Sequence, residues 1–180
     1  MEDISLHILD IAENSIAAGA VLIKIKIVED INNDIFSLEI EDNGRGIPEE
    51  LITEVLDPFY TTRKTRKVGF GLSLLAQSAR EAGGSISIKS RERVGTLVFV
   101  QFKHSHIDRK PLGNIADTLI VLIAGNPDID LVFTHSKNNN NYVLDTRQIK
   151  AEIVDIPINS PSVLSFIRKD LGEYLKRINK

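Results

Sequence analysis

The loop at residues 42–48, with the sequence Asp-Asn-Gly-Arg-Gly-Ile-Pro, constrains this chain more than any other segment. It follows residues 36–41, where apolar and polar residues alternate and predict a half-buried strand. Asp42 therefore stands at a strand end, directly before Gly44 and Gly46, which allow a ligand to approach the backbone closely. Its carboxylate accepts hydrogen bonds, as recognition of a purine amino group requires. On this loop alone, an ordinary turn is the better interpretation.

Composition excludes several classes of protein. With 180 residues, 42% hydrophobic and 26% charged, the chain has the makeup of one globular domain or of one domain with a small appendage. The net charge of −3 gives no basic field for nucleic acid, and the absence of cysteine excludes disulfides and thiolate metal sites. The acidic N-terminus and the lack of a long apolar run predict a cytoplasmic protein without membrane contact.

The first predicted helix carries a polar stripe. Apolar residues recur at helical spacing over residues 3–18, and Gly19 is a suitable stop. His7, Asp10 and Asn14 are three and four residues apart, so they lie on one side of this helix. Such a stripe is either a solvated helix edge or part of a binding site.

The following segments predict an antiparallel sheet with a short helix. Residues 21–28 are rich in β-branched side chains and form a strand, which a polar turn joins to the strand that ends at Asp42. Residues 48–52 begin with proline and two acids, which is typical of a helix start. Further on, residues 85–90 and 96–102 predict a second hairpin.

Positive charge and glycine come together at residues 63–72. Four basic residues fall within five positions: Arg63, Lys64, Arg66 and Lys67. Gly69 and Gly71 then precede a helix that we expect to end near Ala82. Free N–H groups at such a helix start hold anions, and the basic run would complement a triphosphate, although a solvated loop also explains it.

Four segments resemble, in order and spacing, the nucleotide-binding boxes of one family. They are Glu13-Asn14-Ser15, the loop at residues 42–48, the segment 57–63, and Gly69-Phe70-Gly71-Leu72. Together they resemble the N, G1, F and G2 boxes of the GHKL ATPase superfamily, which groups gyrase, a heat-shock chaperone ATPase, histidine kinases and MutL. Residues 59–75 look most like histidine kinases, and residues 13–20 look like MutL. The resemblance favours the binding-site interpretation of the polar stripe.

The resemblance implies an α/β fold for residues 1–104, in which a two-layer sandwich packs helices on a mixed, mostly antiparallel sheet. This is the Bergerat ATP-binding fold, and its expected ligands are ATP and Mg²⁺. Asn14 matches the asparagine that coordinates Mg²⁺, and Asp42 with Thr96 matches the residues near the adenine. The other residues expected at the nucleotide are Gly44, Gly46, Ile47, Phe59, Thr62, Lys64, Gly69, Phe70, Gly71 and Leu72.

Two residues are candidates for catalysis. Asp10 stands where the hydrolysing members carry the glutamate that activates water, and aspartate is one methylene shorter. Glu13 lies about 100° round the helix from Asn14 and is a poorer candidate. Arg63 is the second candidate, because it matches the basic residue after the paired threonines.

The resemblance ends near His104, and residues 105–180 belong to no family that their sequence identifies. Here we expect a helix over residues 114–124, strands at 130–135 and 142–144 around a tight loop, and a helix over 161–176. These elements either extend the first sheet or form a small second lobe. His104 and His106 could suggest a metal site, but the end of a surface strand explains them better.

Three functions remain open for the chain. A histidine-kinase-like domain is the first, and since no helical hairpin with a phosphoacceptor histidine is recognisable, it would act in trans on a partner protein. A slow ATPase or ATP-gated switch is the second. The third is a non-catalytic regulatory subunit that binds nucleotide.

Overall fold

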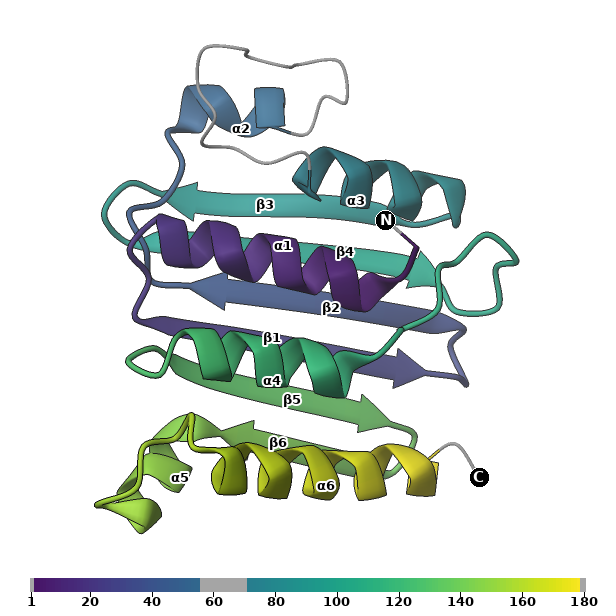
Figure 1. Ribbon diagram of the computed structural model, residues 1–180. Coiled ribbons are helices and arrows are strands. Elements are labelled where there is room, and N and C mark those ends of the chain that lie inside the picture. The colour runs from purple at the N-terminus through teal and green to yellow at the C-terminus, as the bar shows by residue number, and fades with distance from the viewer. Residues whose placement is uncertain (1, 56–70, 179–180) are drawn as a thin grey trace.

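The computed structural model describes residues 2–55 and 71–178. The chain forms a six-stranded sheet in the order β3-β4-β2-β1-β5-β6, with helices on one face (Figure 1). The helices are α1 (Ile4–Ala17), α2 (Glu49–Val55), α3 (Gly71–Glu81), α4 (Ile115–Gly125), α5 (Thr146–Ile153) and α6 (Pro161–Ile178). The strands are β1 (Leu22–Asp30), β2 (Ile35–Asp42), β3 (Ser85–Arg91), β4 (Gly95–Lys103), β5 (Asp130–Lys137) and β6 (Asn140–Asp145).

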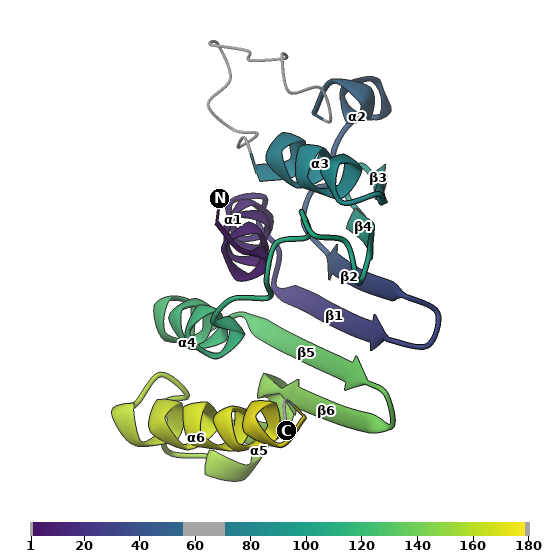
Figure 2. The same cartoon turned by 90° about the vertical axis from the view of Figure 1, so that its right-hand side faces the viewer.

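The predicted sandwich is confirmed. Every neighbouring pair of strands is antiparallel except β1 and β5, which run parallel. Figure 2 shows α1, α3, α4 and α6 in one layer beside the sheet, whose other face is uncovered in the described structure. Apolar side chains from alternate strand positions meet the helices in one core; Phe36 and Phe102, for example, pack edge to face with ring centroids 5.9 Å apart.

Helix α1 begins where local chemistry predicts. The Asp3 side chain caps it by accepting a hydrogen bond from the Leu6 amide. Gly19, with φ of +80°, ends it in the left-handed region. The N–H groups of Ile4 and Ser5 donate to the carbonyls of Pro111 and Leu112, so the start of α1 is tied to the connector before α4. Distant segments of the chain therefore fix the position of this helix.

The C-terminal elements extend the first sheet, which decides between the two arrangements that the sequence left open. β5 pairs with β1 along its whole length, and α4 packs beside α1. Glu29 at the end of β1 lies between His135 on β5 and His104 after β4, with Oε–Nε2 distances of 3.0 and 3.1 Å. Hydrogen bonds to the two imidazoles, which outweigh the burial of the carboxyl, lower the pKa of Glu29 to about 2.

Sequence periodicity missed α5. Only Thr146 of this eight-residue helix is buried, so its sequence carries little of the apolar pattern that marks a helix. The Asp145 side chain caps it through the Arg147 amide. Among residues 2–55 and 71–178, no helix has both the length and the apolar character that a membrane span needs.

Candidate functional site

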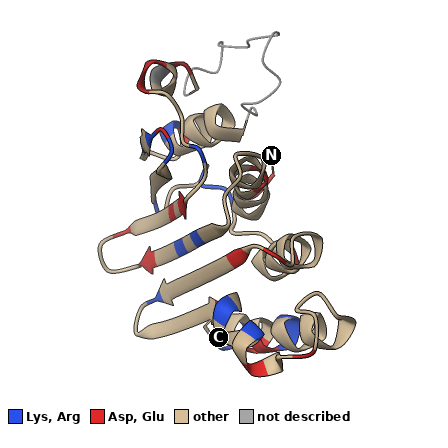
Figure 3. Ribbon diagram, turned by 90° about the vertical axis from the view of Figure 1, so that its left-hand side faces the viewer, with Lys and Arg blue, Asp and Glu red and all other residues tan. Residues whose placement is uncertain are grey.

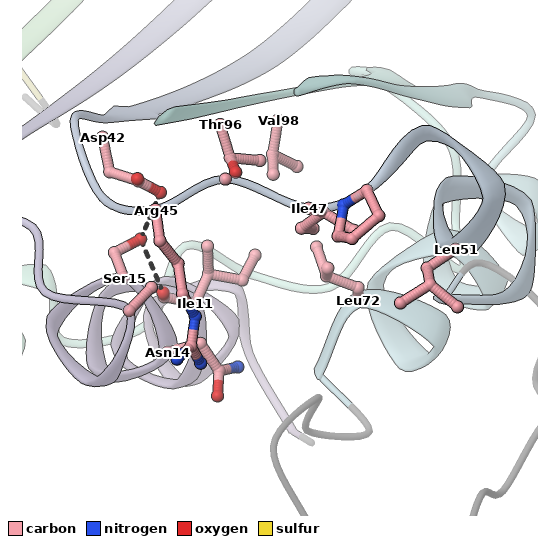
Figure 4. A pocket seen from close by; sticks show the side chains of 13 residues that line it. Ile11, Asn14, Ser15, Asp42, Arg45, Ile47, Leu51, Leu72, Thr96 and Val98 are labelled. Atoms are coloured by element: carbon pink, nitrogen blue, oxygen red, sulfur yellow. Dashed lines mark hydrogen bonds between the residues drawn. The ribbon is translucent and has the colours of Figure 1, made fainter. Parts of the chain in front are cut away.

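A cavity of about 250 Å³ opens between α1, the loop after β2, β4 and the first turn of α3 (Figure 4). Its wall combines a few polar groups with apolar side chains, as small-molecule sites commonly do. The lining residues are Ile11, Asn14, Ser15, Ala18, Asp42, Arg45, Gly46, Ile47, Pro48, Leu51, Leu72, Thr96 and Val98. Six of the residues that the sequence predicted are in this wall: Asn14, Asp42, Gly46, Ile47, Leu72 and Thr96.

The Asp42 carboxylate is held at both oxygens. Ser15 Oγ donates to Asp42 Oδ2 at 2.7 Å, and the Gly44 amide donates to Asp42 Oδ1 at 2.8 Å. Ser15 Oγ also lies 3.1 Å from the carbonyl of Ile11 on the same helix. Asp42 thus has a fixed orientation in the cavity wall, and a carboxylate with about four lone-pair positions keeps acceptor capacity for a ligand.

Backbone lies against backbone at Gly46 of the loop, so that position requires glycine, and the space at Gly44 is tight. A Cβ on Gly46, where φ is +72°, would overlap the carbonyl of Arg91 at the end of β3. The Arg93 amide donates to the Arg45 carbonyl at 2.7 Å and joins the same two loops. On the α1 side, Gly44 lies close to the Ala18 carbonyl, which accepts from the Arg45 amide.

Thr96 faces Asp42 across the β2–β4 pair. Its Oγ1 lies 2.8 Å from Ser90 Oγ on β3, and that hydroxyl also accepts a hydrogen bond of 2.7 Å from the Ile47 amide. Ser90 therefore holds both the hydroxyl beside Asp42 and the backbone of the loop. Neighbouring hydroxyls of this kind position one another and present a polar edge to the cavity.

Asp10 lies next to the cavity, between Asn14 and the start of α3. Asn14 Nδ2 is 3.4 Å from Asp10 Oδ2, a long contact that leaves Asn14 Oδ1 for another partner. A Cβ on Gly71 would overlap Asp10 Oδ2, so any larger residue would have to displace this carboxylate. Burial raises the pKa of Asp10, and hydrogen bonds with Asn14 and the Gly71 backbone oppose that rise. The carboxylate is thus a stronger base than an exposed aspartate.

His7 is buried, so this end of the polar stripe is not a solvated helix edge. Only 2% of its surface is exposed, and burial lowers its pKa to about 4. The ring is neutral at pH 7, and a backbone hydrogen bond with Gly71 partly offsets the burial. Two residues of α1, His7 and Asp10, therefore contact the first residue of α3.

Some predicted site residues fall outside the described part of the chain: Phe59, Thr62, Arg63, Lys64, Gly69 and Phe70. In the other direction, sequence reasoning did not single out Ser15, Arg45 or Ser90. Ser15 and Arg45 lie inside the recognised boxes. Their places in the sequence close to Asn14 and Asp42 could have identified them as site residues. Ser90 lies far from both boxes in sequence, and only the β3–β4 pairing brings it near Ile47.

The protein oxygens at the cavity would bind Mg²⁺ only together with oxygens of a bound ligand. Among the described residues, no three His, Cys, Asp or Glu side chains come together as a metal site. Asn14 offers one neutral amide oxygen on the cavity wall. Mg²⁺ keeps several waters and commonly takes phosphate oxygens as its other partners, so a single protein oxygen beside a bound polyphosphate is a fitting site.

Comparison with known proteins gives a match to more than half of the chain. A family model described as histidine kinase-, DNA gyrase B-, and HSP90-like ATPase matches residues 2–106. That range holds all four boxes and stops shortly after β4.

Individual relatives agree with this match. An NtrY-like sensor histidine kinase of Rickettsia conorii is 30% identical over 110 residues, which are 61% of this chain and 18% of that protein. The sensor histidine kinase YkoH of Bacillus subtilis is 40% identical over 74 residues, 38% of this chain and 16% of its own. The chain thus spans less than a fifth of the length of these relatives.

Solved structures include one that is similar over most of the fold. The MutL ATPase domain of Aquifex aeolicus, complexed with ADP, has a TM-score of 0.54 at 16% identity and covers 86% of this chain and 70% of its own. At this identity the similarity concerns the fold.

Proposed function

Because this chain belongs to the family of histidine kinase-, DNA gyrase B- and HSP90-like ATPases, we propose that it binds ATP with Mg²⁺ in the α1–β4 cavity and transfers a phosphoryl group to a partner protein. The matched relatives named as sensor histidine kinases support the transfer reaction. ATP is a cytoplasmic metabolite, and the proposal places the domain in that compartment.

One observation carries the proposal: Asp42 lies in the cavity wall with its carboxylate fixed by Ser15 and Gly44. An adenine amino group is a donor and would bond to the remaining acceptor positions of this carboxylate. Apolar side chains of Ile11, Leu72 and Val98 line the same cavity and suit the flat faces of the base. A guanine, which carries a carbonyl oxygen in place of that amino group, would meet the carboxylate unfavourably.

Asn14 would hold the metal. Bound Mg²⁺ neutralises charge on the phosphate oxygens. The Asn14 amide lies on α1, one turn after Asp10, so the polar end of the cavity is the expected place for the phosphates. Gly71 and Leu72 begin α3 on the opposite wall, where N–H groups of a helix start favour anions.

Slow hydrolysis is the second candidate function, and the position of Asp10 favours it. Its carboxyl has a raised pKa and contacts the asparagine that we assign to the metal. A general base needs both reach to the water and a suitable pKa. In this reaction Asp10 would take the proton from the water. In transfer to a partner, Asp10 would instead orient or deprotonate the accepting group.

The experiment that tests the proposal is a calorimetric titration with Mg²⁺ATP and with a non-hydrolysable analogue, on the wild type and on Asp42→Asn. We expect saturable, Mg²⁺-dependent binding that Asp42→Asn abolishes, because its amide would present a donor to the adenine amino group. Glu39→Gln is the matched control, since Glu39 lies on the same strand but on the uncovered face. Equal binding by Asp42→Asn and the control would refute the site.

Phosphate release and labelling of partner proteins by radiolabelled ATP separate the two reactions. Transfer gives labelled protein, and hydrolysis gives free phosphate alone. Neutralising Arg63 and Lys64 tests the role that their charge predicts: we expect ATP to lose more affinity than ADP, and an equal loss would contradict contact with the γ-phosphate.

A further inference from the structure

The two edges of the sheet differ in how they are protected. β3 forms one edge and carries Lys89 and Arg91. β6 forms the other edge and has the sequence Asn-Asn-Tyr-Val-Leu-Asp, without lysine, arginine or proline. Figure 3 shows the Lys and Arg residues in blue, and none lies on this strand. Charged residues and proline are the usual means of keeping an edge strand from pairing with another chain. The first five residues of β6 include neither a charged residue nor a proline.

The outer edge of β6 is also accessible. The helix that follows, α5, turns back toward the start of β5, where Lys150 Nζ donates to the Ile129 carbonyl at 3.0 Å. α6 lies over the inner face of β6 (Figure 1). The rings of Tyr142 on β6 and Tyr174 on α6 are stacked, with their centroids 4.8 Å apart. Among the described residues, none pairs with the outer edge of β6.

Large apolar side chains are exposed on both sides of this edge. Val143 is 61% exposed on the uncovered face of the sheet. On the helical side, Phe166 is 66% exposed and lies one turn before Asp170, which accepts a hydrogen bond from Tyr142. A further strand added beside β6 would cover Val143 and approach Phe166.

The sequence of β6 is self-complementary in one antiparallel register. If Val143 is paired with Val143 of a second copy, Asn141 faces Asp145 of that copy and Tyr142 faces Leu144. Opposed residues share a face of the sheet, so Asn141 lies beside Asp145 on the uncovered face and Tyr142 lies beside Leu144 on the inner face. The Asp145 carboxylate already accepts hydrogen bonds from Arg147. Centring the pair on Tyr142 would instead oppose Asn141 to Val143. Centring it on Leu144 would oppose Val143 to Asp145.

We propose that β6 pairs antiparallel with β6 of a second copy of this chain, about a two-fold axis at Val143. The two sheets then form one continuous sheet of twelve strands, counting six from each copy. Such an interface is isologous, because each copy contributes the same strand. The nucleotide cavities lie away from it, on the side of β2 and β4.

Sedimentation equilibrium of the wild type tests the proposal, together with Val143→Lys and Val143→Glu. We expect a concentration-dependent dimer for the wild type and a monomer for each variant, because like charges would face each other across the axis. Mixing the two variants should restore a dimer, since Lys and Glu then oppose each other. This restoration also shows that both variants are folded. Circular dichroism of each variant alone gives the same check.

Ser87→Lys is the matched control, because Ser87 is an exposed residue of the opposite edge strand β3. It should leave the dimer unchanged. Amide hydrogen exchange should slow with protein concentration in β6 and stay constant in β3. A wild type that is monomeric at every concentration, or a dimer that persists in Val143→Lys, would overturn the proposal.

Discussion

Ser15 Oγ donates a hydrogen bond of 2.7 Å to Asp42 Oδ2, and this contact joins α1 to the end of β2 across 27 residues of sequence. The two residues come from different recognised boxes. Their hydrogen bond fixes the carboxylate on one side, and the Gly44 amide fixes it on the other. A ligand that bonds to Asp42 therefore meets a group that loses little freedom on binding.

Removing this hydroxyl tests the arrangement. Ser15→Ala should lower the affinity for ATP by about tenfold. Hydrogen bonds to charged groups contribute about 1.5–3 kcal/mol, and the loss should lie near the lower end because the Gly44 amide still holds the Asp42 carboxylate. Calorimetry measures the change. Ser78→Ala on α3 is the control, since the buried Ser78 hydroxyl has no hydrogen-bond partner among residues 2–55 and 71–178 and lies outside the cavity wall. Unchanged affinity in Ser15→Ala would mean that Gly44 alone orients Asp42.

Asp10→Asn separates binding from chemistry. If Asp10 is the general base, hydrolysis should fall by about 10²-fold or more while the ATP affinity stays within a few-fold, because the amide keeps the contact with Asn14 but cannot accept a proton. Phosphate release and calorimetry give the two numbers. Glu13→Gln, on the exposed side of α1, serves for comparison. Retained hydrolysis in Asp10→Asn would assign the base elsewhere.

Gly71→Ala tests the close contact between α1 and α3. The new methyl group would overlap Asp10 Oδ2, and such overpacking costs about 1–3 kcal/mol of the free energy of unfolding. The penalty should shrink in an Asp10→Ala background, where the carboxylate is gone. Gly172→Ala, which meets open space in α6, should instead stabilise the protein by about 0.5–1 kcal/mol. Denaturant titrations measure all four variants. An equal penalty in both backgrounds would contradict the contact.

The lowered pKa of His7 predicts that the folded protein loses stability on mild acidification. Its pKa is about 4 in the folded protein and 6.5 in the unfolded chain, so the unfolded chain binds the extra proton first. The free energy of unfolding should fall by about 3 kcal/mol as the pH drops from 6.5 to 4. His7→Gln should remove most of this slope, as measured by urea denaturation at several pH values.

Glu29 acts in a different pH range. Its folded pKa of about 2 lies below the ordinary value of 4.5, so its stabilisation is complete above pH 4.5 and is lost as the pH falls toward 2. The two ranges barely overlap, and Glu29 therefore serves as an internal comparison. A wild-type stability that stays constant between pH 6.5 and 4 would contradict the burial of a neutral His7.

The sequence by itself determined the local elements and the order of the binding boxes. The alternation before Asp42 and the glycine at position 19 act within a few residues, and such short-range patterns can be recognised from the sequence alone. The hydrogen bond between the Gly44 amide and the Asp42 carboxylate is also local, because the two residues are only two positions apart. The fold class followed from these elements and from the resemblance they carry.

Tertiary structure decided the contacts between segments that are distant in sequence. The Ser90 hydroxyl at the Ile47 amide, Gly71 against Asp10, and β5 alongside β1 all depend on how elements pack. Burial is decided in the same way, and His7 changes from a residue of a polar stripe to a buried neutral histidine because the folded chain excludes water from its ring. Packing and desolvation depend on what lies next to a residue in space, and sequence periodicity describes only one element at a time.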